Sequence, residues 1–106
     1  MSDTQTLPDC LFCKLANSPD GLIWQNDEFA AFKDIHPKER VHILIVPKDH
    51  VNSLDEATPE LSGSLLEATR QVAAEQGVTG AYRVAINVGR KGGQEVDHLH
   101  LHLMAP

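Results

Sequence analysis

The sequence predicts an α+β fold built on an antiparallel sheet, and two observations lead to that class. Five short segments have the composition or the alternation typical of strands, and one long segment with helical periodicity lies between the third and the fourth. The strand segments are 22–25, 28–33, 41–46, 82–88 and 96–104. The first three follow one another through short loops, which favours antiparallel pairing.

The chain begins with a polar leader, residues 1–9, which we expect to be flexible. A short helix is expected from Leu11 to Asn17. The next two strands, Leu22–Gln25 and Glu28–Lys33, are joined by Asn26-Asp27, a pair of residues typical of a hairpin turn. The first part of the chain therefore supplies one short helix and one hairpin.

The third strand is a run of β-branched and apolar residues, Val41–Val46, that Pro47 closes. Its longest apolar stretch, Ile43–Val46, is far shorter than the roughly 20 residues that cross a bilayer. The N-terminus has no basic-then-apolar signal pattern. We therefore expect a cytoplasmic protein without a membrane partner.

The long helix is expected over Thr58–Gln76. Thr58 suits the N-cap, Pro59 the first helical position, and Gly77 the stop after the last turn. Apolar residues fall on one face at helical spacing, namely Leu61, Leu65, Ala68 and Val72. This face is expected to pack on the sheet.

Length and charge limit the possible functions. The 106 residues are enough for one domain, expected to span 1–106. The formal net charge is −6, and lysine and arginine form no dense run. A nucleic-acid polymer, which needs a broad basic surface, is therefore not an expected partner, whereas a small phosphorylated ligand needs only a local pocket.

Three histidines alternate with leucines near the end of the chain. The imidazoles are those of His98, His100 and His102, and the leucines between them are Leu99, Leu101 and Leu103. In a strand the two sets point to opposite faces, so that the leucines reach a core. A purification tag would be consecutive histidines, and three solvated histidines in register would be unusual.

The alternation also argues against one metal ion bound by all three rings. The Cα atoms of His98 and His102 lie about 13 Å apart in a strand, too far for all three imidazoles to converge. The row instead suits an extended ligand, with the central imidazole acting on a phosphorus centre. The preceding loop, Gly89–Gly93, offers N–H groups and positive charge to phosphate, although such a loop is more often only a mobile turn.

The segment Gly92–Leu103 resembles the signature of the histidine triad superfamily, in which three histidines alternate with apolar residues after Gly-Gln. Three further segments resemble other parts of that family in the same order: Leu11–Leu15, Ala31–Ile35 and Val41–His50. Asn87 and the chain length are similar to the Hint branch. The resemblance implies a five-stranded antiparallel sheet with one long and one short helix, and a two-fold homodimer with a ten-stranded sheet.

The resemblance implies a nucleotide hydrolase or transferase that acts through a covalent nucleotidyl-histidine. Its expected substrates are purine nucleoside phosphoramidates, in which an AMP-type nucleotide is joined to an amine. A dinucleoside polyphosphate hydrolase is the close alternative. A nucleotide-binding regulator with little catalysis is a further alternative.

The resemblance also implies residue roles. His100 would attack the α-phosphorus, with a backbone carbonyl holding its other ring N–H, while His102 and His42 would contact the phosphate and His98 would complete the triad. The expected nucleotide contacts are Asn87 near the leaving group, Asp34 at the ribose, Phe12, Phe32 and Ile35 at the base, and the signature residues Gly93 and Gln94. Taken singly, the apolar residues are more often core, and Asp34 is more often a turn former.

Cys10 and Cys13 form a Cys-x-x-Cys pair, which in a cytosolic protein indicates a metal or redox element before a disulfide. By resemblance to bacterial members of the family, His50 and His98 would complete a structural zinc site with both cysteines. The alternative is a short helix with two small residues and no metal. A zinc-bound His98 would not be free to act as a proton donor. Glu95 stands where some Hint members have a hydroxyl residue.

Overall fold

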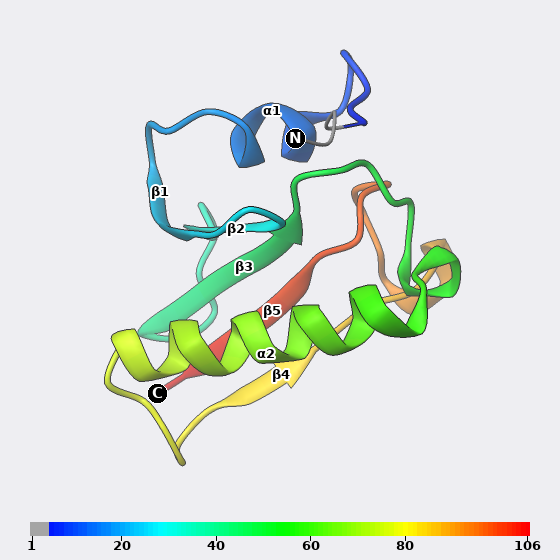
Figure 1. Ribbon diagram of the computed structural model, residues 1–106. Helices are drawn as coiled ribbons and strands as arrows, with labels where there is room; N and C mark the ends of the chain where they lie inside the picture. Colours follow the sequence, from blue (N-terminus) through cyan, green and yellow to red (C-terminus); the bar gives the residue numbers. More distant parts are fainter. Residues whose placement is uncertain (1–4) are drawn as a thin grey trace.

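A five-stranded antiparallel sheet in the order β1-β2-β3-β5-β4 organises the computed structural model, which describes residues 5–106 (Figure 1). The strands are β1 (Leu22–Gln25), β2 (Phe29–Lys33), β3 (Val41–Pro47), β4 (Arg83–Ala85) and β5 (Leu101–Ala105). The helices are α1 (Leu11–Ala16) and α2 (Pro59–Glu75), with two short 3-10 helices, η1 (Leu54–Glu56) and η2 (Arg90–Gly92). The predicted fold class and sheet are confirmed.

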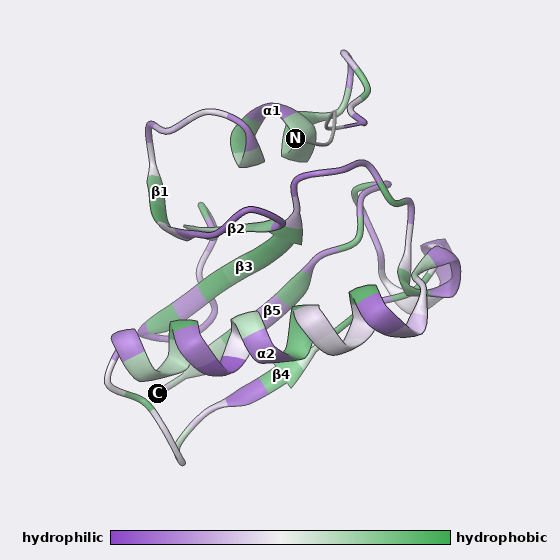
Figure 2. Ribbon diagram, in the orientation of Figure 1, coloured by the Kyte–Doolittle hydropathy of each residue, from purple (hydrophilic) through white to green (hydrophobic). Residues whose placement is uncertain are grey.

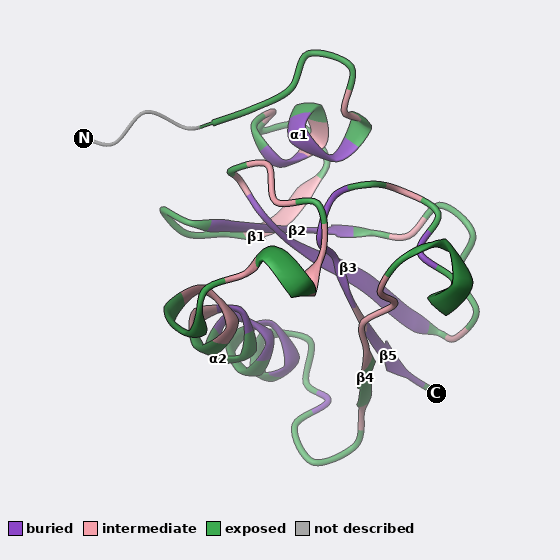
Figure 3. Cartoon of the chain, turned by 90° about the vertical axis from the view of Figure 1, so that its right-hand side faces the viewer, coloured by how far each residue is buried: buried purple, intermediate pink, exposed green. Residues whose placement is uncertain are grey.

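Strand β3 lies at the centre of the sheet, and every one of its residues is buried because both faces are covered. Ile43 and Ile45 pack into the core cluster that includes the α2 side chains. Leu44 and Val46 face the other way, into the cluster that includes α1. Figure 3 shows the two helices on opposite sides of the sheet, and Figure 2 shows β3 as a mostly hydrophobic strand.

Both helices begin where the sequence predicts. Thr58 caps α2 by accepting a hydrogen bond from the N–H of Leu61, and Pro59 is the first helical residue. Cys10 caps α1, with its Sγ accepting from the N–H of Cys13 at 3.3 Å. A cysteine at this position has a second use, described below.

The last two strands are shorter than predicted. Strand β5 starts at Leu101 instead of Val96 because the N–H of Leu99 leaves the ladder and donates to the carbonyl of Val51 at 2.7 Å. Strand β4 ends at Ala85, the partner of His102, since β5 gives it little more to pair with. The alternation nevertheless extends back to Leu99, which lies in the core.

The expected flexible leader is only partly described, since residues 1–4 lie outside the described residues. Gln5 donates its N–H to Asp49 Oδ1 at 2.7 Å and accepts a hydrogen bond from the N–H of His50. The start of the described chain is therefore tied to the segment that follows β3. Within residues 5–106, no helix has the length and apolar character needed to cross a membrane.

Candidate active site and metal cluster

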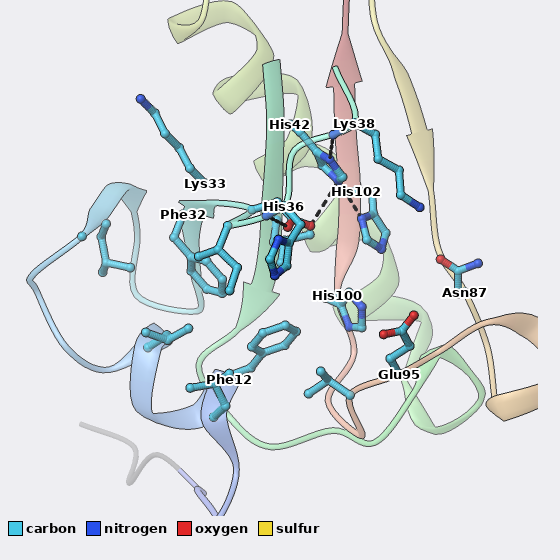
Figure 4. Close-up of a pocket in the computed structure, with 18 of the residues that line it drawn as sticks. Phe12, Phe32, Lys33, His36, Lys38, His42, Asn87, Glu95, His100 and His102 are labelled. Carbon is cyan, nitrogen blue, oxygen red and sulfur yellow. Dashed lines mark hydrogen bonds and ion pairs between the residues drawn. The ribbon is translucent and has the colours of Figure 1, made fainter. Parts of the chain in front are cut away.

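A pocket of about 740 Å³ opens over the α1-facing side of the sheet, between β2, β3 and the histidine row (Figure 4). It brings together most of the predicted site residues: Phe12, Phe32, Asp34, Ile35, His42, Asn87, Gly93, His100 and His102. Among the predicted catalytic and nucleotide-binding residues, two do not line it. His98 and Gln94 are buried beside the pocket and make other contacts.

His100 is held in one tautomer by the main chain. Its Nδ1 lies 2.7 Å from the carbonyl oxygen of His98, which can only accept, so Nδ1 carries the proton. In the neutral ring, Nε2 therefore has a free lone pair. The Phe12 ring meets the imidazole edge-on, with centroids 5.0 Å apart. These two contacts fix both the tautomer and the orientation of the ring.

His42 and His102 form a hydrogen-bonded pair whose tautomers follow from one backbone donor. The N–H of Lys38 donates to Nδ1 of His42 at 3.0 Å, so the His42 proton must be on Nε2. That Nε2 lies 2.9 Å from Nδ1 of His102, which therefore accepts. The proton of neutral His102 is then on its Nε2, where it can be donated to a ligand.

The surroundings of His102 keep this ring neutral. Burial lowers its pKa to about 4, with further lowering from the positive charge that His100, His42 and Lys38 can carry. Asp34 raises this pKa, with less effect than burial, His100 or His42 and more than Lys38. At neutral pH His102 is thus a hydrogen-bond donor without a formal charge.

The nucleoside end predicted from the sequence has an apolar and a polar side. Phe12 and Phe32 pack edge-to-face with centroids 5.5 Å apart, and Ile35 is 84% exposed at the pocket lining. Asp34 accepts the N–H of His36 at Oδ1 and has its Oδ2 3.4 Å from Nε2 of His42. An exposed isoleucine beside two aromatic rings is the arrangement expected for a slot that a flat ligand fills.

Asn87 and Gly93 approach each other closely at the far side of the pocket. The Asn87 amide donates to the carbonyl of Gly92 at 2.8 Å. Gly93 has φ +92°, and a Cβ on it would lie 3.2 Å from the Asn87 side-chain nitrogen. Glycine therefore suits position 93 for both backbone and steric reasons.

Three basic residues that the sequence reading missed also line the pocket: Lys33, His36 and Lys38. All three lie in or beside the loop between β2 and β3, and Figure 4 shows the Lys38 side chain extending toward the side of Asn87. They could have been predicted from the sequence because they flank Asp34 and Ile35, two of the expected nucleotide contacts. Glu95 lines the pocket next to His100 (Figure 4).

Cys10, Cys13, His50 and His98 form a separate cluster behind His100, with one ligand atom from each lying within 4.8 Å of all the others. Nδ1 of His98 lies 3.3 Å from Cys10 Sγ and 3.5 Å from Cys13 Sγ. Nδ1 of His50 lies 3.3 Å from Cys13 Sγ. Four such donors match the ligand set of a tetrahedral zinc site.

The tautomers in this cluster also fit a metal. Nε2 of His98 donates to the carbonyl of Pro47 at 2.8 Å, and Nε2 of His50 donates to Asn52 Oδ1 at 2.8 Å. Both Nδ1 atoms therefore present lone pairs to the sulfurs, as a metal requires. Burial lowers the pKa of His98 to about 4 and raises the pKa of the Cys13 thiol.

A second group with metal-ligating side chains, Asp34, His42 and His102, has equally close donor atoms but does not fit a metal. Nδ1 of His42 accepts the Lys38 N–H, so its Nε2 must carry a proton. A metal on that Nε2 would require a ring without any proton. This group is therefore suited to donate hydrogen bonds.

The chain is similar to known proteins over most of its length. The family model described as HIT domain matches residues 16–106. The chain belongs to the HIT family. Protein HitA of Neisseria gonorrhoeae is 39% identical over 103 residues, covering 92% of this chain and 96% of HitA.

Two solved structures of HIT proteins extend the comparison. A HIT family hydrolase from Legionella pneumophila is 36% identical, with a TM-score of 0.84 and 92% of each chain covered. A zinc-bound histidine triad family protein from Mycobacterium smegmatis is 30% identical, with a TM-score of 0.79, covering 92% of this chain and 74% of that one. The HIT domain match begins at Ala16, so Cys10 and Cys13 precede the matched part.

Proposed function

We propose that this HIT protein is a hydrolase or transferase that cleaves purine nucleoside phosphoramidates at the α-phosphorus through a nucleotidyl intermediate on His100. The observation that carries this proposal is the fixed tautomer of His100. Its Nδ1–H is held by the His98 carbonyl, so its Nε2 lone pair is available in a pocket that also contains the Nε2–H of His102. A preorganised neutral imidazole is an effective nucleophile.

In the first step, Nε2 of His100 forms a bond to the α-phosphorus, and the bond from phosphorus to the amine nitrogen breaks. The electron pair stays on that nitrogen, which takes up a proton from solvent and leaves as the free amine. The His100 ring becomes positively charged, and its Nδ1–H becomes a stronger donor to the His98 carbonyl. His102 would donate its Nε2–H to a phosphate oxygen as negative charge develops there.

In the second step, water attacks the phosphorus, the bond to His100 breaks, and its electron pair returns to Nε2. The water proton passes to solvent, and the nucleoside monophosphate departs. Phe12, Phe32 and Ile35 would hold the base, and Asp34 would accept from ribose hydroxyls. Asn87 and Gly93 would contact the phosphate side, opposite the base slot.

Two charged residues bear on the leaving group. The Glu95 carboxylate lines the pocket and favours an amine, which becomes positively charged in water, over a departing polyphosphate. The Lys38 ammonium lines the same pocket and favours a polyphosphate. A dinucleoside polyphosphate hydrolase is therefore the second candidate function.

The deciding experiment compares an adenosine phosphoramidate with diadenosine polyphosphates on wild type and His100→Ala. We expect faster turnover of the phosphoramidate and an AMP adduct on His100 in the intact mass of rapidly quenched protein. His100→Ala should lose at least about a thousandfold in kcat/KM. Gln71→Ala, an exposed change on α2, is the matched control. Nucleotide binding without turnover of either substrate would favour the regulator, and turnover without an adduct would exclude the covalent route.

A structural zinc ion is part of this proposal, held by Cys10, Cys13, His50 and His98. Bound there, it would cross-link α1 to the segment that follows β3 and to the segment that precedes β5. It would take no part in the chemistry at phosphorus. The Nδ1 lone pairs of His98 and His50, left free by the hydrogen bonds at their Nε2 atoms, support it. Zinc analysis of the purified protein tests the assignment.

We also propose the homodimer expected from the sequence, with β4 pairing across a two-fold axis into a ten-stranded sheet. Strand β4 is at one end of the sheet order, Val84 is 44% exposed on it, and Leu66 of α2 is 52% exposed. Sedimentation at micromolar concentration should give a dimer for wild type and a monomer for Val84→Asp. A monomeric wild type would rule the pairing out.

A further inference from the structure

One segment, residues 89–97, contributes to the lining of the pocket and lies near the cysteine and histidine cluster. Beside the cluster lies a second cavity of about 580 Å³, lined in part by Cys10, His50 and Asn52. Glu95 and Val96 line both cavities. A change in the position of this segment would therefore alter the shape of both cavities.

The Gln94 side chain is the internal brace of this segment. It is 3% exposed, and its Oε1 accepts the N–H of Gly89 at 2.9 Å. Its Nε2 donates to the carbonyls of Asn52 and Val96, at 2.6 and 2.9 Å. Both amide hydrogens and the amide oxygen are thus used, and the segment is closed on itself and onto Asn52.

Asn52 continues this network into the cluster. Its side-chain oxygen accepts the Nε2–H of His50, whose Nδ1 faces Cys13, while its carbonyl oxygen accepts from Gln94. Hydrogen bonds therefore run without a break from a cluster ligand to the loop that carries Gly93 and Glu95. Gln94, which makes three of these hydrogen bonds, is buried, while Asn52 is exposed at the surface.

We propose that Gln94 is a positioning residue that couples occupancy of the cysteine and histidine cluster to the shape of the nucleotide pocket, through Asn52 on one side and the loop 89–97 on the other. This inference rests on the proposed nucleotide site. It assigns Gln94, expected from the sequence to contact the nucleotide, an indirect role. Since coupling between two binding sites is reciprocal, it can be measured from either site.

The test measures AMP affinity by calorimetry on the full chain, loaded with zinc and stripped with a chelator. It also measures zinc affinity by chelator competition, with and without saturating AMP. In wild type we expect AMP to bind about tenfold more tightly to the loaded protein, and AMP to tighten zinc binding by the same factor. A purely structural role for Gln94 would change the melting temperature and leave this ratio unchanged.

Two variants locate the coupling. Gln94→Met has similar length but none of the three hydrogen bonds, and should reduce the ratio to about threefold or less. Gln94→Glu keeps the acceptor for Gly89 and loses both donors; it should also reduce the ratio, and it serves if Gln94→Met does not fold. Gln71→Met, on the exposed face of α2, should keep the wild-type ratio.

The outcomes separate the two proposals. AMP binding of equal strength to loaded and stripped wild type would overturn the coupling and leave the proposed function standing. An unchanged ratio in the folded Gln94 variants would overturn the role of Gln94. Failure of AMP to bind the loaded wild type would overturn the proposed function, and this inference with it.

Discussion

The protein has two neighbouring clusters of histidines. They differ in the hydrogen-bond partner of the ring nitrogen that points away from the centre of each cluster. Around the cysteines, the Nε2 atoms of His98 and His50 donate to oxygen atoms that can only accept. Their Nδ1 atoms, which face the sulfurs, therefore have lone pairs. In the pocket, Nδ1 of His42 accepts a backbone N–H, so its Nε2, which faces His102, carries a proton. One cluster is therefore prepared to bind a cation and the other to donate to an anion.

The comparison teaches that proximity of ligating side chains is not sufficient for a metal site. Both clusters bring their donor atoms within 4.8 Å. The partner of the opposite ring nitrogen distinguishes them, because it fixes the tautomer. His100 lies between the clusters and receives its own tautomer from the main chain of His98.

The largest effect is expected from breaking the cysteine cluster. Cys13→Ser replaces a buried thiolate donor and should lower the free energy of unfolding of the zinc-loaded protein by more than about 3 kcal/mol. Zinc content should fall with it, and kcat should change less than stability does. Denaturant unfolding and metal analysis check this. Equal unfolding curves for apo and metal-loaded wild type would contradict the metal assignment.

Breaking the pocket cluster should affect activity more than metal content. His42→Phe fills the same space but removes the donor that fixes His102, so kcat/KM should fall about 10- to 100-fold. Zinc content should stay at the wild-type value, since none of the four cluster residues is touched. Loss of zinc in this variant would contradict the assignment of the metal to the cysteine cluster, because His42 is not one of its four residues.

A smaller change sharpens the comparison from the metal side. Asn52→Ala removes the acceptor for Nε2 of His50 and should weaken zinc binding about tenfold. Asn52→Asp keeps an acceptor at that position and is the matched control, with an affinity near that of wild type. Competition with a zinc chelator measures both. Equal affinities in the two variants would mean that the acceptor for Nε2 of His50 has no effect on zinc binding.

A last comparison concerns the pH dependence of stability. The pKa of His102 is about 4 in the folded protein against 6.5 as its ordinary value. Between these values the unfolded chain binds the proton more strongly, so the stability present above pH 6.5 is lost as the pH falls toward 4.

The comparison with His102→Gln isolates this contribution. Protonation of the metal ligands occurs in both proteins and cancels in the difference between their free energies of unfolding. We expect wild type to lose stability relative to His102→Gln between pH 6.5 and 4. A constant difference over that range would contradict the lowered pKa.

The sequence predicted the strands and both helices because each has a local signal, whereas most of the pocket residues were implied only by the resemblance to the histidine triad superfamily. The alternation at residues 98–103 separates the histidines from the leucines, and this separation persists although strand pairing starts only at Leu101. The role of Gln94 had no such signal, because its partners at Asn52 and Gly89 are fixed by tertiary contacts. The tautomer of His42 also had no such signal, because it depends on the backbone N–H of Lys38, whereas the resemblance implied that of His100.

Helix α1 has only six residues, too few to persist in water without support from the rest of the molecule. Yet Phe12, the ring that contacts both Phe32 and His100, is on it. In the absence of zinc, we expect this aromatic wall to open more readily in native fluctuations than the sheet does. Amide hydrogen exchange should therefore be faster at residues 11–16 than in β3. The part of the pocket that α1 supplies should open while the sheet stays folded.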